Sequence, residues 1–395
     1  MPVLKRAGFF SFSYFSIFEN MIGTLSRIWI LGFLVIFSCS QEEKNDIDFA
    51  FQLETISFEL GSSAFSSQTS FFLNVDYERN VLLVLNPYLY SIDTLDFNTS
   101  SYKLGNEIDR DGPSAIIGIN SFLNYYDSIA FYMGSNSFYI DSKSEGLSSK
   151  KFSQVEGVEG SLQRITQGSE FGNCLRCADN EQVLLFNSIE KQGDYYFLQA
   201  EKLGQINDEL IDFGLSGEFA SNKIEFAISA KNKVVKGPVS YIQKIGNRYL
   251  VSWDFQSSIQ FLNFSGENEL AIAFNSDFFP NRKGFSPRDQ RITDHQDFTA
   301  KSTEWNNDVS FGPIYRVPES ENYFRLVKGK TSHRSKLDGG IFIVIFDSEF
   351  NFLAEKLINA DTPEMGLEYF VLKSGIYIKR VTDSEDLLRY YRLIF

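Results

Sequence analysis

The residues best suited to binding a ligand gather between residues 275 and 310. Basic side chains can hold carboxylate or phosphate groups, and the face of an indole can pack against a sugar ring. A segment of this length with few strand signals is uncommon unless it is functional or disordered. We therefore predict a loop that grips an anionic or glycan ligand, with an ordinary solvated insertion as the alternative. Its candidate residues are Arg282, Lys283, Arg288, Arg291, His295 and Trp305.

Acidic pairs are a second source of chemistry, because two carboxyl groups across a cavity can hydrolyse a glycosidic bond. The same segment holds Asp289, Asp294, Glu304 and Asp308, and loops are where functional residues concentrate. The chain has only two histidines, so few bases are available for Ser-His-Asp or Cys-His catalysis. No catalytic residue can be singled out from the sequence.

The turn Glu107–Gly112 has the first half of a calcium-binding loop, with carboxylates at alternate positions and a glycine at the sixth. Its twelfth position is Gly118, where such a loop needs a bidentate glutamate, and Pro113 follows the turn at once. We interpret the segment as a charged turn, with a cation site as the alternative, and predict no metal and no other cofactor.

Cys174 and Cys177 form a C-x-x-C pair. In an oxidising compartment such a pair can close a small loop, whereas a thioredoxin-like site needs a βαβ setting that the sequence lacks. A structural zinc site would need two further ligands. We predict a local disulfide or an idle thiol pair, with metal binding through distant ligands and redox activity as the alternatives.

The apolar segment after Arg27 predicts where the protein is sent. Ten largely apolar residues follow this arginine, and as a helix they would span about 15 Å, half of a bilayer core. That length suits a signal peptide better than a membrane span. The run Ile36-Phe37-Ser38-Cys39 resembles the bacterial lipobox, in which cleavage leaves an acylated cysteine at the N-terminus. We predict a leader and lipoprotein signal peptide at 1–38 and an acylated Cys39 with a polar tether at 39–48; a buried helix is the alternative.

Charge and composition exclude several classes of protein. The chain carries 51 acidic and 37 basic residues, a net charge of −14, so its surface repels nucleic acid and anionic membranes. The lipid is then the expected means of membrane attachment. Forty Phe and 19 Tyr residues favour strands and exclude a disordered chain.

Short apolar or alternating runs, separated by Asn, Asp, Gly and Ser, fill residues 49–395, with no sustained helical stripe. This pattern predicts a single all-β domain, a β-propeller with six or seven four-stranded blades. Gly-Pro pairs at 112, 237 and 312 fit blades of roughly 40 residues, each pair preceding an expected inner strand. A strand near Phe51–Leu60 is expected to complete the blade begun by Leu387–Phe395.

Several short segments together resemble a family of Bacteroidetes lipoproteins, the domain of unknown function 4221 group. These segments are Val81–Leu85, Asp111–Ile119, Tyr126–Phe131, Tyr315–Val317, Ile345–Phe350 and Ser374–Ile378. The resemblance covers nearly all of the chain after the tether. It implies a TolB-like propeller and brings no catalytic residues with it.

These observations lead to an expected function and location. We expect a lipid-anchored cell-envelope protein on the outer membrane, periplasmic or surface-exposed, that binds or scaffolds a protein, peptide or glycan. One alternative is a glycan hydrolase or lyase that uses carboxylates in the propeller channel. Another is an accessory lipoprotein of outer-membrane assembly. Nucleic acid is not an expected partner.

Overall fold

The computed structural model describes residues 49–395 in part. The chain divides into two compact units, Met1–Ile47 and Asp48–Phe395, and every described residue belongs to the second. Cys39 and the predicted leader therefore lie outside the described residues. Also outside them are 62–72, 87, 106, 113–114, 117–120, 126–128, 134–136, 143–145, 152–161, 165–173, 177–181, 189–194, 202–204, 212–220, 228–232, 246–247, 264–266, 286–291, 293, 332–338, 360–364 and 381–385.

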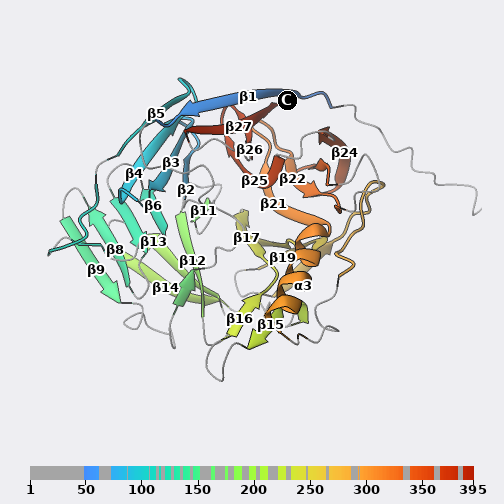
Figure 1. Ribbon diagram of the computed structural model, residues 1–395, viewed down its shortest axis with the longest axis horizontal. Helices are drawn as coiled ribbons and strands as arrows, with labels where there is room; N and C mark the ends of the chain where they lie inside the picture. Colours follow the sequence, from blue (N-terminus) through green and yellow to red (C-terminus); the bar gives the residue numbers. More distant parts are fainter. Residues whose placement is uncertain are drawn as a thin grey trace, which may run out of the picture. The chain divides into compact units, whose positions relative to one another are not determined.

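The described part of the chain is mostly strand, in antiparallel sheets whose strands largely follow chain order (Figure 1). Four sheets have four consecutive strands: β2 (Leu73–Asp76), β3 (Val81–Asn86), β4 (Ser91–Asp96) and β5 (Ser101–Lys103); β6 (Ser121–Tyr125), β7 (Ile129–Met133), β8 (Ser137–Ser142) and β9 (Gly146–Lys151); β17 (Ser240–Ile245), β18 (Arg248–Trp253), β19 (Gln256–Leu262) and β20 (Asn268–Ile272); β21 (Ser310–Arg316), β22 (Tyr323–Lys328), β23 (Ile341–Phe346) and β24 (Phe352–Asn359). The predicted predominance of β-structure is confirmed.

Two further groups of strands lie between the second and third of these sheets in the chain. One is a sheet of β10 (Leu162–Arg164), β11 (Cys174–Arg176), β12 (Gln182–Ser188), β13 (Tyr195–Glu201) and β14 (Gln205–Ile211). Its strands β10 and β11 both pair with β12. The other is the hairpin of β15 (Ile224–Ala227) and β16 (Lys233–Lys236).

The two ends of the domain meet in one sheet. The strand β1 (Gln52–Glu59) pairs antiparallel with β27 (Leu387–Ile394), and the sheet continues through β26 (Gly375–Arg380) to β25 (Met365–Leu372) (Figure 1). This confirms the predicted pairing of the first strand with the last. A strand from the N-terminal end thus covers what would otherwise be an exposed sheet edge.

An α-helix, α3 (His295–Asn307), lies where a loop without helical pattern is predicted, so that prediction is wrong. Asp294 caps the helix, because its carboxylate accepts the Asp297 amide at 2.8 Å. Phe298 and Trp305 are its buried residues, and their spacing of two turns leaves little helical periodicity in the sequence. None of the helices described is long and apolar enough to cross a membrane.

The Gly-Pro pairs mark strand starts less consistently than expected. The pair at 237–238 precedes β17, as predicted. The pair Gly312-Pro313 instead lies inside β21, at a register shift between Phe311 and Ile314. A bulge suits proline there, because proline has no N–H to donate to the ladder. Pro113 lies outside the described residues.

The segment between 275 and 310 contributes buried side chains to the core, although most of its described residues are exposed. Phe279 and Val309 join a cluster of buried side chains that includes Phe274 and Phe311. The Phe279 and Phe311 rings meet edge to face, with 6.0 Å between centroids. Burial of a phenylalanine contributes about 1.5–3 kcal/mol, so this segment helps to hold the neighbouring sheets together.

Candidate functional site

The structure brings together two of the six residues predicted to grip a ligand. Lys283 and Trp305 are buried, with exposures of 6% and 2%, and the Lys283 Nζ atom lies 4.6 Å from the Trp305 ring centroid. The ammonium also donates to the Trp305 carbonyl at 3.0 Å and to the Ser310 hydroxyl at 2.8 Å. Lys283 therefore ties the end of α3 to β21.

Arg282 and His295 are not part of this buried pair. Arg282 is exposed; its guanidinium lies 5.0 Å from the Phe255 ring centroid and donates to Asn222. His295 is exposed at the first turn of α3. Arg288 and Arg291 lie outside the described residues.

Lys283 borders a cluster of polar side chains around Asp254, at the turn between β18 and β19. Asp254 keeps part of its surface exposed, and its Oδ1 atom accepts the Val239 amide at 2.9 Å. Two tyrosines belong to the same cluster, Tyr241 on β17 and Tyr315 on β21. Each is on the first strand of its sheet, so the cluster lies where two successive sheets begin.

Arg325 of β22 donates hydrogen bonds to the backbone on both sides of the Asp254 turn. Its side chain is fully buried, and Nη2 donates to the Trp253 carbonyl at 2.5 Å, Nη1 to the Ser257 carbonyl at 3.2 Å, and Nε to the Gly312 carbonyl at 2.7 Å. The guanidinium thus joins the β18–β19 turn to the bulge of β21. Charged donors make stronger hydrogen bonds than neutral ones.

Tyr369 of β25 fixes the same bulge from the next sheet. Its hydroxyl donates to the Pro313 carbonyl and accepts the Leu326 amide at 3.2 Å. A Cβ atom at Gly312 would come within 2.5 Å of the Tyr369 hydroxyl. Gly312 therefore provides the space in which this tyrosine packs.

Burial controls the protonation of the cluster. It raises the pKa of Asp254, although the Lys283 ammonium acts in the opposite direction. Burial also raises the pKa of Tyr241, with the nearby Asp254 adding to the effect, and it raises the pKa of Tyr315. Both phenols are therefore neutral at physiological pH. Residues with shifted pKa values that lie close together are typical of functional sites.

Burial lowers the pKa of Lys283 from 10.5 to about 8, against the attraction of Asp254 and Asp308 and together with repulsion from Lys236 and Lys328. At pH values between these two pKa values, Lys283 is protonated in the unfolded chain and largely neutral in the folded chain. The free energy of unfolding therefore rises with pH. Across that pH interval we expect the free energy of unfolding of the wild type to rise by up to roughly 3 kcal/mol relative to that of Lys283→Met. Urea denaturation at a series of pH values measures it.

The exposed Lys330 offers the matched control for this experiment. Its replacement by methionine should leave a stability profile parallel to that of the wild type. A Lys283→Met profile that also runs parallel to the wild type would contradict the lowered pKa.

The other buried carboxylates are engaged in hydrogen bonds. Asp308 is 3% exposed, and its two oxygens accept the Phe285 and Val309 amides at 2.9 and 2.8 Å. Asp93 is fully buried and accepts four hydrogen bonds, from Asn86, Ser91, Tyr102 and Gly105. These two residues have structural roles.

Asp294 and Glu304 of the predicted acidic set lie apart from Asp308 in the chain, at the start and on the surface of α3. Asp294 caps α3, Glu304 is exposed on that helix, and Asp289 lies outside the described residues. The structure therefore assembles no acidic pair from them within the described part of the segment.

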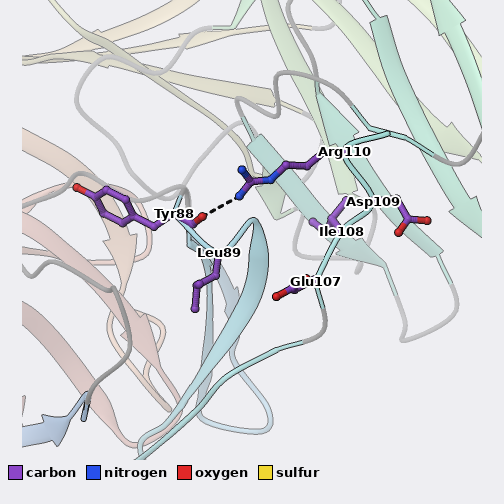
Figure 2. A pocket seen from close by; sticks show the side chains of 6 residues that line it. All are labelled: Tyr88, Leu89, Glu107, Ile108, Asp109 and Arg110. Atoms are coloured by element: carbon purple, nitrogen blue, oxygen red, sulfur yellow. Dashed lines mark hydrogen bonds between the residues drawn. The ribbon is translucent and has the colours of Figure 1, made fainter. Parts of the chain in front are cut away.

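A separate pocket of about 330 Å³ lies at the turn that begins with Glu107. Figure 2 shows its lining residues, which are Tyr88, Leu89, Glu107, Ile108, Asp109 and Arg110. Arg110 points toward Tyr88 and donates to its carbonyl at 2.7 Å. Its guanidinium also lies 4.8 Å from the Tyr90 ring centroid. The arginine thus braces the turn, in keeping with its interpretation as a charged turn.

Metal and disulfide predictions remain largely untested. Among the described residues, no group of three or more His, Cys, Asp or Glu side chains could hold a metal ion. Cys174 begins β11, whereas Cys177 lies outside the described residues, so the disulfide stays a prediction.

Comparison with known proteins identifies the family. The model of the domain of unknown function 4221 matches residues 46–357. The chain belongs to this family. A 4221 family member from Bacteroides vulgatus has a crystal structure that is similar to this chain, with a TM-score of 0.55 and 12% identity over 89% of this chain and 99% of the other. This similarity supports the fold.

Two further solved structures are more distant from this 4221 family chain. A candidate exported protein from Bacteroides fragilis has a TM-score of 0.45 and 12% identity, over 89% of this chain and 97% of the other. A protein of unknown function from Bacteroides thetaiotaomicron has a TM-score of 0.40 and 11% identity, over 87% and 76%. No curated protein matches the chain.

Sequence reasoning missed the central residues of the cluster in this 4221 family protein. Tyr241 and Tyr315 each follow a Gly-Pro pair by two or three positions, and Asp254 lies between Trp253 and Phe255 at a tight hairpin turn. An acid between two large aromatics was the available signal.

Proposed function

We propose that this 4221 family protein is a lipid-anchored binding module on the outer membrane, built as a β-propeller. Six sheets of at least four strands in the described residues would form the blades, with the hairpin β15–β16 as an insertion. Contacts between neighbouring sheets support this arrangement: β2 contacts β6, β11 contacts β17, β18 contacts β21, β21 contacts β25, and β25 contacts β2. The last of these contacts joins the final sheet to the first.

The cluster around Asp254 is the observation that carries a binding role. It places a partly exposed carboxylate and two neutral phenols on a rigid base, where the first strands of two sheets meet. A ligand that is a protein, peptide or glycan would find fixed hydrogen-bonding groups there. Preorganised polar groups on strands suit recognition, because little conformational entropy is lost on binding.

A glycan hydrolase or lyase is the alternative, and the raised pKa of Asp254 is the observation in its favour. Such enzymes use two carboxyl groups about 5–9 Å apart. The neighbouring acid Asp308 has both oxygens committed to backbone amides. This supports binding ahead of hydrolysis. Hydrolysis would be favoured over binding if the wild type released reducing sugar from a panel of glycans and Asp254→Asn did not.

The lipid anchor is tested by cell fractionation. We expect Cys39→Ala to move nearly all of the protein from the membrane to the soluble fraction, because the acyl chains of Cys39 supply the attachment. Cys174→Ala is the matched control and should stay with the membrane. Membrane attachment that survives Cys39→Ala would contradict the anchor.

A further inference from the structure

Three oxygen atoms of the cluster are available to a ligand. Among the residues that the structure describes, the Asp254 Oδ2 atom and the hydroxyls of Tyr241 and Tyr315 have no hydrogen-bond partner. Asp254 and Tyr315 keep part of their surface exposed, and Tyr241 is 8% exposed. None of the three oxygens is among the fully buried unpaired atoms of the described residues, so a ligand or ordered water can reach them.

These three groups lie close together. Asp254 and Tyr315 both act through space on the pKa of Tyr241. In the β17–β18 ladder Tyr241 pairs with Ser252, two residues before Asp254. The side chain of Gln243 on β17 donates to the Ile314 carbonyl on β21, next to Tyr315. The two strands that carry the tyrosines are therefore joined at the cluster.

The charges around the cluster favour a neutral ligand. Lys283, Lys236 and Arg325 all lie near Asp254 and would repel a cation. An anion gains little from them, because Arg325 donates to backbone carbonyls and Lys283 to the Trp305 carbonyl and the Ser310 hydroxyl. An anion would also be repelled by the Asp254 carboxylate. The groups that remain available for hydrogen bonds are one acceptor, on Asp254, and two hydroxyls, on Tyr241 and Tyr315, that can donate or accept.

We propose that Asp254, Tyr241 and Tyr315 form a binding site for the hydroxyl groups of a neutral sugar, either free or at the end of a glycan. The Asp254 Oδ2 atom accepts from a sugar hydroxyl, and the two phenols donate to or accept from its neighbours. This proposal rests on the binding function proposed above and names its ligand class.

Calorimetric titration of the purified full-length protein tests the site. The probes are glucose, galactose, mannose and N-acetylglucosamine at millimolar concentrations, with glucuronate and glucosamine as anionic and cationic counterparts. We expect at least one neutral sugar to bind. Tyr241→Phe and Tyr315→Phe each remove one hydroxyl and should weaken that binding about three- to tenfold, and Asp254→Asn by a similar factor. Unchanged unfolding midpoints would show that the variants are folded.

Tyr88→Phe supplies the matched control, because Tyr88 is 57% exposed at the other pocket; this variant should bind the sugar as the wild type does. The proposal is overturned if no neutral sugar binds, if a charged counterpart binds more tightly, or if the phenylalanine variants keep full affinity. None of these outcomes affects the membrane release expected of Cys39→Ala, so the anchored module can stand when the sugar site fails.

Discussion

Deletion of residues 49–60 is expected to abolish the cooperative unfolding transition of the domain. All eight residues of β1 pair with β27, from Gln52 opposite Ile394 to Glu59 opposite Leu387. Phe58 is fully buried, and its ring lies edge to face with Phe97 at 4.8 Å between centroids.

The energies explain why this deletion should be so damaging. Truncation of one buried phenylalanine costs about 3–5 kcal/mol, and domains are stable by only about 5–15 kcal/mol. Loss of β1 removes Phe58 and Leu60 from the core and also leaves β27 with an unpaired edge. Circular dichroism during urea denaturation measures the transition, and aggregation through the exposed edge is the expected companion effect.

A peptide of residues 49–60 provides the positive control. Added to the truncated chain, it should restore part of the transition, because the pairing partner β27 is still present. A second control removes residues 1–48 and should leave the transition intact. A truncated chain from residue 61 with the wild-type midpoint would show that β1 is dispensable.

Arg325→Met is expected to destabilise the protein by about 3–5 kcal/mol, because several buried carbonyls lose their charged donor. These carbonyls belong to Trp253, Ser257 and Gly312. Methionine fills a similar volume, so the loss reports the hydrogen bonds more than packing. The free energy of unfolding from urea denaturation is the measurement.

Two further arginine variants make the test sharper. Arg316 is exposed on the neighbouring strand and donates to the Ser320 carbonyl within its own hairpin, so Arg316→Met should cost under about 1 kcal/mol. Arg325→Lys keeps the charge but cannot reproduce the planar set of donors, and it should recover less than half of the loss. Equal effects of Arg325→Met and Arg316→Met would contradict the structural role of Arg325.

The candidate site was only partly predictable, and its members show why. Lys283 and Trp305 were found because a basic and an aromatic residue stood out in a segment with few strand signals. The structure gives them a different environment from the one expected, since both are buried in contact with each other. Burial depends on which distant strands pack over a segment, and local composition does not encode it.

Asp254, Tyr241 and Tyr315 illustrate the opposite case. Asp254 follows β18 and Tyr315 lies in β21, two strands whose residues are mostly buried, and Tyr241 lies in β17. Nothing local distinguishes these three residues from packing residues. Their proximity arises because two hairpins separated by some sixty residues in the chain place their first strands together.

Local sequence patterns were sufficient to predict the predominance of strands, the family and the pairing of the first strand with the last. Repeated short apolar runs, aromatic residues and turn residues set these features locally, through a period of two and the need to cover a sheet edge. Tertiary packing sets the helical conformation of α3, the burial of Lys283 and the hydrogen bonds by which Arg325 joins two sheets beside Asp254. These features depend on contacts between residues far apart in the chain, whose energies come from burial and hydrogen bonds that no local pattern records.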